Sequence, residues 1–294
     1  MGGRFGAVVT AMATPFAEDG SLDLDGAQTL AAHLYEHGTD SIVVAGSTGE
    51  SPTLTHAEKL DLFRAVVDVA KDKGQVIAGT GTYNTAETVE LSAEAAACGV
   101  DGLLVVTPYY NKPPQRGLVA HFGKVAESTE LPIIAYNIPS RTATRIEHET
   151  MLTLAAMPNI VGVKDSTGDL GGVSRLIREA PAGFEVYSGD DWAAFAIACL
   201  GGVGLVSVAA HLVGDKIAQM LHLVFDGDVP SARKIHEELS PLFTTLFITS
   251  NPIPLKAALE VLGLPGGEPR LPLLAATPDE RDKVRRTLED AGLL

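Results

Sequence analysis

Short apolar runs rich in Val, Ile and Gly alternate along this chain with longer segments in which apolar residues recur at helical spacing. The runs are continuously apolar, which is typical of strands covered on both faces in a parallel sheet. The eight predicted strands are residues 7–11, 41–45, 76–80, 102–107, 133–137, 160–164, 185–188 and 204–209.

A segment of helical periodicity follows each predicted strand. These segments are residues 24–37, 56–73, 86–98, 117–128, 147–156, 170–180, 191–200 and 214–225. Eight β/α units with right-handed crossovers close naturally into an α/β fold of the (β/α)8 TIM-barrel type. A doubly wound open sheet is the structural alternative.

The C-terminal part of the chain predicts helices without further strands, at residues 229–247, 254–262 and 278–291. The Pro- and Gly-rich segment 264–274 predicts a loop between them. We therefore expect a barrel at 1–226 that carries the active site. An all-helical extension at 227–294 would dock on the barrel or pack between subunits.

Composition narrows the classes of protein to consider. The formal net charge is −15, and 46% of the residues are hydrophobic against 20% charged. This favours a compact globular chain and argues against binding to nucleic acid or to anionic membranes. The sequence has neither a signal-peptide pattern nor an apolar stretch of about 18 residues. We expect a cytoplasmic protein.

Polar residues gather at the C-terminal ends of the predicted strands, where barrel enzymes place their catalytic groups. Lys164 is the most informative, because it ends an apolar run rather than lying on a polar helix face. Gly162 lies on the same side of that strand, so we expect space below the lysine if this side faces the interior. Burial favours the neutral amine, which can attack a ketone to form an imine. The alternative is a structural ion pair with Asp165 or another barrel carboxylate.

Hydroxyl groups at neighbouring strand ends could transfer protons to and from such a lysine. Tyr136 ends the preceding strand, and Tyr110 or Thr48 could extend the relay. The turn Gly-Ser-Thr-Gly-Glu at residues 46–50 offers backbone N–H groups and two hydroxyls to a carboxylate. Arg141 could hold a second carboxylate, or could instead form an ion pair at the surface or at an interface.

Together these motifs resemble the pyruvate-dependent class I aldolases, the family that includes dihydrodipicolinate synthases and N-acetylneuraminate lyases. The resemblance spans nearly the whole chain. Its motifs are Gly-Ser-Thr-Gly-Glu at 46–50, Thr-Pro-Tyr-Tyr-Asn-Lys-Pro at 107–113, Tyr-Asn-Ile-Pro-Ser-Arg-Thr at 136–142, Val-Lys-Asp-Ser at 163–166, Ser-Gly-Asp-Asp at 188–191 and Asn-Pro-Ile-Pro at 251–254.

The resemblance implies a catalytic set. Lys164 forms a Schiff base with pyruvate, without a metal or any other cofactor. Tyr136, Thr48 and Tyr110 form the proton relay, with Tyr110 supplied by the neighbouring subunit. The implied assembly is a homotetramer built as a dimer of dimers.

The resemblance also implies how substrates bind. Ser47 and Thr48 hold the pyruvate carboxylate, Arg141 receives L-aspartate 4-semialdehyde, and backbone groups of Gly189 and Val206 line the lysine pocket. The implied reaction is condensation of the two substrates to 4-hydroxy-tetrahydrodipicolinate, the first committed step of diaminopimelate and lysine synthesis.

Other branches of this family act on other substrates. N-acetylneuraminate lyases and keto-sugar-acid aldolases share the lysine, the tyrosine and the first motif, so the choice of synthase rests on Tyr-Tyr-Asn-Lys-Pro and on Arg141. Ser47 departs from the threonine that is usual in the synthases. The hydroxyl is kept, and the missing methyl costs at most about 1 kcal/mol of packing.

Family members inhibited by L-lysine bind it at a dimer interface. The corresponding positions in this chain are Ser51, His56, Lys59, Tyr83, Glu87 and Tyr109. Lys59 stands where histidine is typical and adds a cation near the ligand's ammonium group. Tyr83 stands where asparagine is typical and adds bulk. We therefore expect weak inhibition or none.

Rival functions fit the sequence less well. A metal-dependent aldolase needs His and carboxylate ligands at several strand ends, and of the eight histidines only His211, just beyond the eighth strand, is close to one. A phosphate-binding isomerase would place glycines after strands seven and eight, but the Gly-rich run 201–204 precedes strand eight. A barrel that binds a small molecule without catalysis would have no use for a buried amine beside Tyr136.

Overall fold

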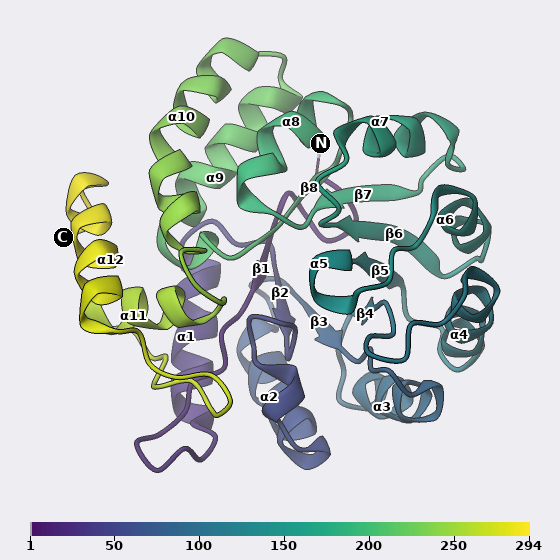
Figure 1. Cartoon of the computed structure of the whole chain (residues 1–294), viewed down its shortest axis with the longest axis horizontal. Coiled ribbons are helices and arrows are strands. Elements are labelled where there is room, and N and C mark those ends of the chain that lie inside the picture. The colour runs from purple at the N-terminus through teal and green to yellow at the C-terminus, as the bar shows by residue number, and fades with distance from the viewer. Residues whose placement is uncertain (1) are drawn as a thin grey trace.

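Eight parallel strands form a closed barrel in the computed structural model, which describes residues 2–294. The strands are β1 (Val8–Ala11), β2 (Ser41–Val44), β3 (Gln75–Gly79), β4 (Gly102–Val106), β5 (Ile133–Asn137), β6 (Ile160–Asp165), β7 (Glu185–Ser188) and β8 (Gly204–Ser207). Pairing of β8 with β1 closes the ring, and helices surround it (Figure 1). The predicted (β/α)8 barrel is confirmed, and the open-sheet alternative is wrong.

Helices connect successive strands along the outside of the barrel. They are α1 (Leu24–Glu36), α2 (His56–Ala70), α3 (Thr85–Ala97), α4 (Gln115–Glu127), α6 (His148–Ala155), α7 (Leu170–Glu179), α8 (Ala194–Cys199) and α9 (Ala210–Phe225). Local sequence fixes several starts. Thr55 and Glu58 form a reciprocal capping box at the start of α2, and the Asp23 side chain accepts a hydrogen bond from a backbone N–H group of α1.

Two short elements lie outside every predicted helix and strand, η1 (Ser51–Thr53) and α5 (Pro139–Thr142), and a third, η2 (Asp191–Ala193), lies within a predicted helix. The predicted helix 191–200 is consequently divided into η2 and α8. The last barrel helix also starts earlier than predicted, at Ala210, but it is interrupted at Val213, whose φ and ψ are −140° and 33°. A Cβ on Gly214 would lie 2.2 Å from the carbonyl oxygen of His37, so close packing on α1 requires glycine there.

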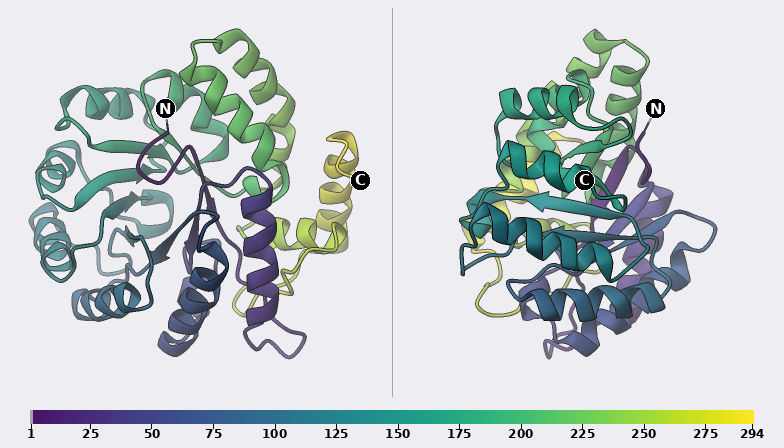
Figure 2. Two further views of the ribbon diagram at one scale, coloured as in Figure 1. Left: turned by 180° about the vertical axis from the view of Figure 1, so that it is seen from behind. Right: turned by 90° about the vertical axis from the view of Figure 1, so that its right-hand side faces the viewer.

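Side chains inside the barrel form an inner core, separate from the larger core between strands and helices. It contains Val9, Val43, Ile77, Leu104, Ile134, Tyr136 and Val206. Phe5, from the N-terminal turn, fills the amino end of this core, where its carbonyl oxygen accepts a hydrogen bond from the Ser41 hydroxyl. The N-terminal turn lies across the barrel when the molecule is seen from behind (Figure 2). Apolar packing therefore fills the amino end, and the polar strand ends lie at the other.

The C-terminal extension consists of α10 (Val229–Thr245), α11 (Ile253–Val261) and α12 (Pro278–Asp290). Helix α10 packs along α9, and α12 packs against α10 and α11. In Figures 1 and 2, α11 and α12 lie at the edge of the molecule, with α12 outermost. None of the helices within residues 2–294 is long and apolar enough to cross a membrane.

Candidate active site

Lys164 lies near the C-terminal end of β6 with only 5% of its surface exposed. Its register partner on β5 is Tyr136, which is also buried. The Nζ atom lies 4.1 Å from the centroid of the Tyr136 ring. The structure thus brings together the predicted nucleophile and the predicted proton-transfer group, since register partners project to the same side of a sheet.

The predicted structural alternative, an ion pair of Lys164 with Asp165, does not occur. Asp165 Oδ1 instead accepts hydrogen bonds from the backbone and the hydroxyl of Thr167. Asp191 accepts from the Ser207 hydroxyl and from the backbone N–H of Val208. Within residues 2–294, Lys164 makes no ion pair at all. The amine is therefore not committed to a structural partner.

Asp190 is a half-buried residue near Lys164, and no role for it was predicted from the sequence. Burial raises its pKa to about 6, and the positive charge of Lys164 opposes that rise. The motif Ser-Gly-Asp-Asp at 188–191 pointed to this strand end, but the sequence could not show which of the two aspartates accepts hydrogen bonds from backbone N–H groups. Asp191 accepts such hydrogen bonds, from the backbone N–H groups of Val208 and Ala209.

Two glycines shape the surroundings of the lysine, one of them differently from what we predicted. A Cβ on Gly162 would lie 2.5 Å from the Glu185 carbonyl oxygen, so the expected space below Lys164 is filled by strand β7. Gly189 packs directly on the lysine, because a Cβ there would lie 3.1 Å from Lys164 Cγ. Val206 is fully buried in the inner core of the barrel.

The two hydroxyl-bearing residues of the Gly-Ser-Thr-Gly-Glu turn have different surroundings. Ser47 is half-buried and lines a cavity of about 310 Å³ that Tyr136 also lines. Thr48 is buried, and its Oγ1 accepts a hydrogen bond of 3.0 Å from Asn251 Nδ2. Asn251 belongs to the Asn-Pro-Ile-Pro motif, but it lies 203 residues from Thr48, and no local pattern predicted their contact.

Arg141 lies on the short helix α5 and lines the same cavity. One of its terminal nitrogens donates a hydrogen bond of 3.2 Å to the Asn251 carbonyl oxygen. It forms no ion pair with another residue of the described part of the chain, 2–294. The guanidinium therefore retains donors for a carboxylate at the cavity wall.

Tyr110, the third predicted relay member, lies at the surface of the chain. It has 89% of its surface exposed, and its φ is +72°. Its neighbour Tyr109 does line the cavity and packs edge-to-face against Tyr83, with ring centroids 5.3 Å apart. Within one chain, Tyr110 projects to solvent rather than toward Lys164.

The residues predicted to surround L-lysine lie partly together. Lys59 is buried, which lowers its pKa, while the nearby Glu87 carboxylate opposes that shift. Glu87 and Tyr83 also contribute to the raised pKa of Tyr109, although burial is the main cause. Ser51 lines the cavity together with Tyr109. His56 contacts Glu94 instead of these residues.

Residues 2–294 contain no cluster of side chains suited to a metal ion. No group of three or more His, Cys, Asp or Glu side chains suited to a metal occurs among residues 2–294. His211 is fully engaged, because Nε2 accepts from the Ala13 N–H at 3.0 Å and Nδ1 lies 2.8 Å from the Val208 carbonyl oxygen. Burial lowers the pKa of His211 to about 4.

Comparison with known proteins decides between the families that this geometry allows. Residues 4–291 match the model of the dihydrodipicolinate synthetase family. The chain belongs to this family. The prediction from the strand-end motifs is therefore confirmed, as is the prediction that the chain is an enzyme.

Individual relatives of this dihydrodipicolinate synthetase family member are similar over almost their full length. The 4-hydroxy-tetrahydrodipicolinate synthase of Moorella thermoacetica is 54% identical, over 99% of this chain and 100% of its own. The structure of the Cyanidioschyzon merolae synthase with lysine bound has a TM-score of 0.97 and 45% identity, covering 99% of both chains.

A third relative is the chloride-inhibited synthase of Acinetobacter baumannii in complex with pyruvate. Its structure has a TM-score of 0.95 and 38% identity, over 99% of this chain and 100% of its own.

Proposed function

We propose that this protein condenses pyruvate, held as a Lys164 Schiff base, with L-aspartate 4-semialdehyde to give 4-hydroxy-tetrahydrodipicolinate, the first committed step toward diaminopimelate and lysine. The observation that carries the proposal is the buried Lys164 amine without an ion-pair partner, 4.1 Å from the Tyr136 ring. The synthase names of the full-length relatives support the choice of substrates.

The protonated imine formed between Lys164 and pyruvate is the electron acceptor in the proposed steps, which therefore require no metal or cofactor. The neutral amine attacks the pyruvate carbonyl carbon, and loss of water gives the imine. Loss of a methyl proton then gives the enamine, whose carbon forms a bond to the aldehyde of the second substrate. The amino group of that substrate finally displaces Lys164 from the imine carbon and closes the ring.

Positioned groups move the protons and hold the substrates. Tyr136 would transfer protons at the imine, with Thr48 and the partner's copy of Tyr110 extending the relay. Ser47 and Thr48 would bind the pyruvate carboxylate, and Arg141 that of the semialdehyde. Support comes from the shared cavity wall of Ser47, Tyr136 and Arg141.

Assembly would complete the site. The exposure of Tyr110 supports a tight dimer in which this side chain enters the partner's cavity, and we propose that two such dimers form a tetramer. We also propose the division into a barrel at 1–226 and an extension at 227–294. The extension would still take part in the site, because Asn251, Pro272 and Leu273 line the cavity.

The decisive experiment is the intact mass of the protein after incubation with pyruvate and borohydride, which reduces an imine to a stable amine. The parent should gain one pyruvate adduct, and Lys164→Ala should gain none. Lys283→Ala, which removes an exposed lysine of α12, is the matched control and should react like the parent. A parent protein without an adduct would refute the Schiff-base mechanism.

A second assay separates the substrates. Product formation from pyruvate should be fast with L-aspartate 4-semialdehyde and slow with N-acetylmannosamine or sugar aldehydes. The opposite preference would assign the chain to one of the lyase or keto-sugar-acid branches of the family.

A further inference from the structure

A buried ion pair connects the hydroxyl-bearing turn of the site to the C-terminal extension. Glu50, at the end of the turn 46–50, places Oε1 2.6 Å from Nζ of Lys256 on α11. The two side chains are only 1% and 2% exposed. Glu50 lines the cavity at the active site, while Lys256 lines a separate cavity of about 940 Å³. The pair therefore stands in the wall between the two cavities.

Both partners are held by further contacts. Glu50 Oε2 accepts a hydrogen bond of 2.9 Å from the Arg270 backbone N–H. Lys256 Nζ donates to the Glu268 carbonyl oxygen at 3.3 Å and lies 4.2 Å from the Phe16 ring centroid. Burial lowers the pKa of Lys256, while Glu50 opposes that shift. Every charged atom of the pair thus has a defined partner in the extension or the turn.

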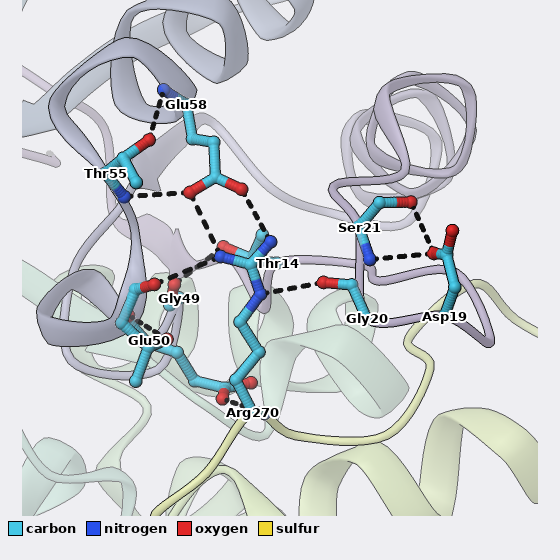
Figure 3. Close-up of polar contacts among 10 residues, drawn as sticks. Thr14, Asp19, Gly20, Ser21, Gly49, Glu50, Thr55, Glu58 and Arg270 are labelled. Carbon is cyan, nitrogen blue, oxygen red and sulfur yellow. Dashed lines mark hydrogen bonds and ion pairs between the residues drawn. The ribbon is translucent and has the colours of Figure 1, made fainter.

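Arg270 extends the connection to the segment that follows the turn. Figure 3 shows its guanidinium between Glu58 and Gly20. Both carboxylate oxygens of Glu58 accept hydrogen bonds from this guanidinium, and its Nε atom donates to the Gly20 carbonyl oxygen. Arg270 also donates to the Thr53 carbonyl oxygen at 3.0 Å. The hydrogen bonds that Arg270 donates to the Glu58 carboxylate are the main cause of that group's lowered pKa, about 2.

The turn itself is strained and depends on outside support. Glu50 has a φ of +54°, a conformation that side-chain-bearing residues seldom adopt. Its N–H donates a hydrogen bond to the Ser47 carbonyl oxygen at 3.1 Å, and the Thr14 hydroxyl donates to Gly49. A shift of Glu50 would therefore move Ser47 directly.

A second link reaches the turn from the same place in the extension. Asn251, just before α11, donates to the Thr48 hydroxyl, and Lys256 in that helix binds Glu50. One short segment of the extension therefore holds the turn at two residues, Thr48 and Glu50. An ion pair in this setting is a costly way to gain stability, because desolvation of two charges offsets their attraction. Its value lies in fixing one geometry.

We propose that Glu50 and Lys256 are positioning residues, through which the C-terminal extension holds Ser47 and Thr48 in the geometry that binds the pyruvate carboxylate. The inference rests on the proposed function, because it concerns the same turn. The residues act through the turn and do not touch substrate.

The test uses the double variant Glu50→Gln with Lys256→Met, which removes both charges and leaves no lone buried charge. The expected result is a folded protein whose KM for pyruvate rises, and whose rate of borohydride-trapped adduct at low pyruvate falls, by about 10- to 100-fold. The KM for the semialdehyde should change much less. A purely structural role would lower the unfolding midpoint and leave pyruvate binding by the folded fraction unchanged.

The matched control is Glu260→Gln with Arg281→Met. This pair joins α11 to α12 with an N–O distance of 2.6 Å and lines the same large cavity as Lys256, but it does not reach the turn. Its removal should leave the KM for pyruvate unchanged.

Glu50→Asp keeps the charge but shortens the side chain by one methylene group, which moves the carboxylate away from Lys256. This variant tests the proposed positioning role if the double variant does not fold. Its KM for pyruvate should also rise. A pyruvate KM equal to the parent's in the folded variants would overturn the inference while the parent still forms the adduct. A parent without an adduct would instead refute the proposed function.

Discussion

A methyl group added at Gly189 tests whether the packing around Lys164 controls its reaction. The Cβ of Gly189→Ala would lie 2.0 Å from Ser166 Oγ, 3.0 Å from the Asp165 carbonyl oxygen and 3.1 Å from Lys164 Cγ. The backbone cannot easily retreat, because the Gly189 N–H donates a hydrogen bond of 2.7 Å to the same carbonyl oxygen. Either β7 or the side chains of β6 must therefore move.

Two magnitudes follow from these contacts. Overpacking of this kind lowers the free energy of unfolding by about 1–3 kcal/mol. Displacement of the Lys164 stem by about 1 Å would slow imine formation by about 100-fold, because the amine leaves its attack geometry. Urea denaturation measures the first effect. The rate of borohydride-trapped pyruvate adduct measures the second.

Two further variants make the result interpretable. Gly171→Ala in α7 is the matched control, because its Cβ would meet only Asp169 Oδ1 at an ordinary 3.5 Å. Alanine is the better helix former by up to about 1 kcal/mol, so this variant should be at least as stable as the parent. Adding Ser166→Ala to Gly189→Ala removes the shortest contact and should restore part of the rate. If Gly189→Ala matched the parent in both stability and trapping rate, the reasoning would be refuted.

Three further predictions concern the interface, the pH dependence and the effector. Tyr110→Phe should lower the turnover rate about 10- to 100-fold with little change in stability. Co-expression with Lys164→Ala should restore activity, because mixed dimers contain a site with Lys164 from one subunit and Tyr110 from the other. No recovery would argue against a site shared between subunits. The lowered pKa of His211, about 4 against about 6.5 in the unfolded chain, contributes up to about 3 kcal/mol of stability above pH 6.5 that is lost as the pH falls toward 4. Urea denaturation at pH 7.5 and pH 4.5 should show a smaller loss for His211→Gln, and an identical loss would contradict this account. L-Lysine should inhibit weakly or not at all in a steady-state assay because of Lys59 and Tyr83, and submillimolar inhibition would overturn that expectation.

Local sequence was sufficient to predict the strands, their order and the position of the nucleophile. Two strands, Ile133–Asn137 and Glu185–Ser188, begin and end where predicted. Continuous apolar runs bounded by turns are a short-range signal, and so is a lysine at the end of such a run. For the same reason the pattern located Lys164 and Tyr136 at strand ends without any knowledge of the barrel.

The tertiary structure alone decided which groups face one another. Strand register places Tyr136 beside Lys164, and the approach of β7 fills the space expected at Gly162. The contact of Asn251 with Thr48 spans 203 residues, and that of Arg270 with Glu50 spans 220. Periodicity reports only which face of an element is buried, whereas such long-range contacts depend on how the extension docks on the closed barrel.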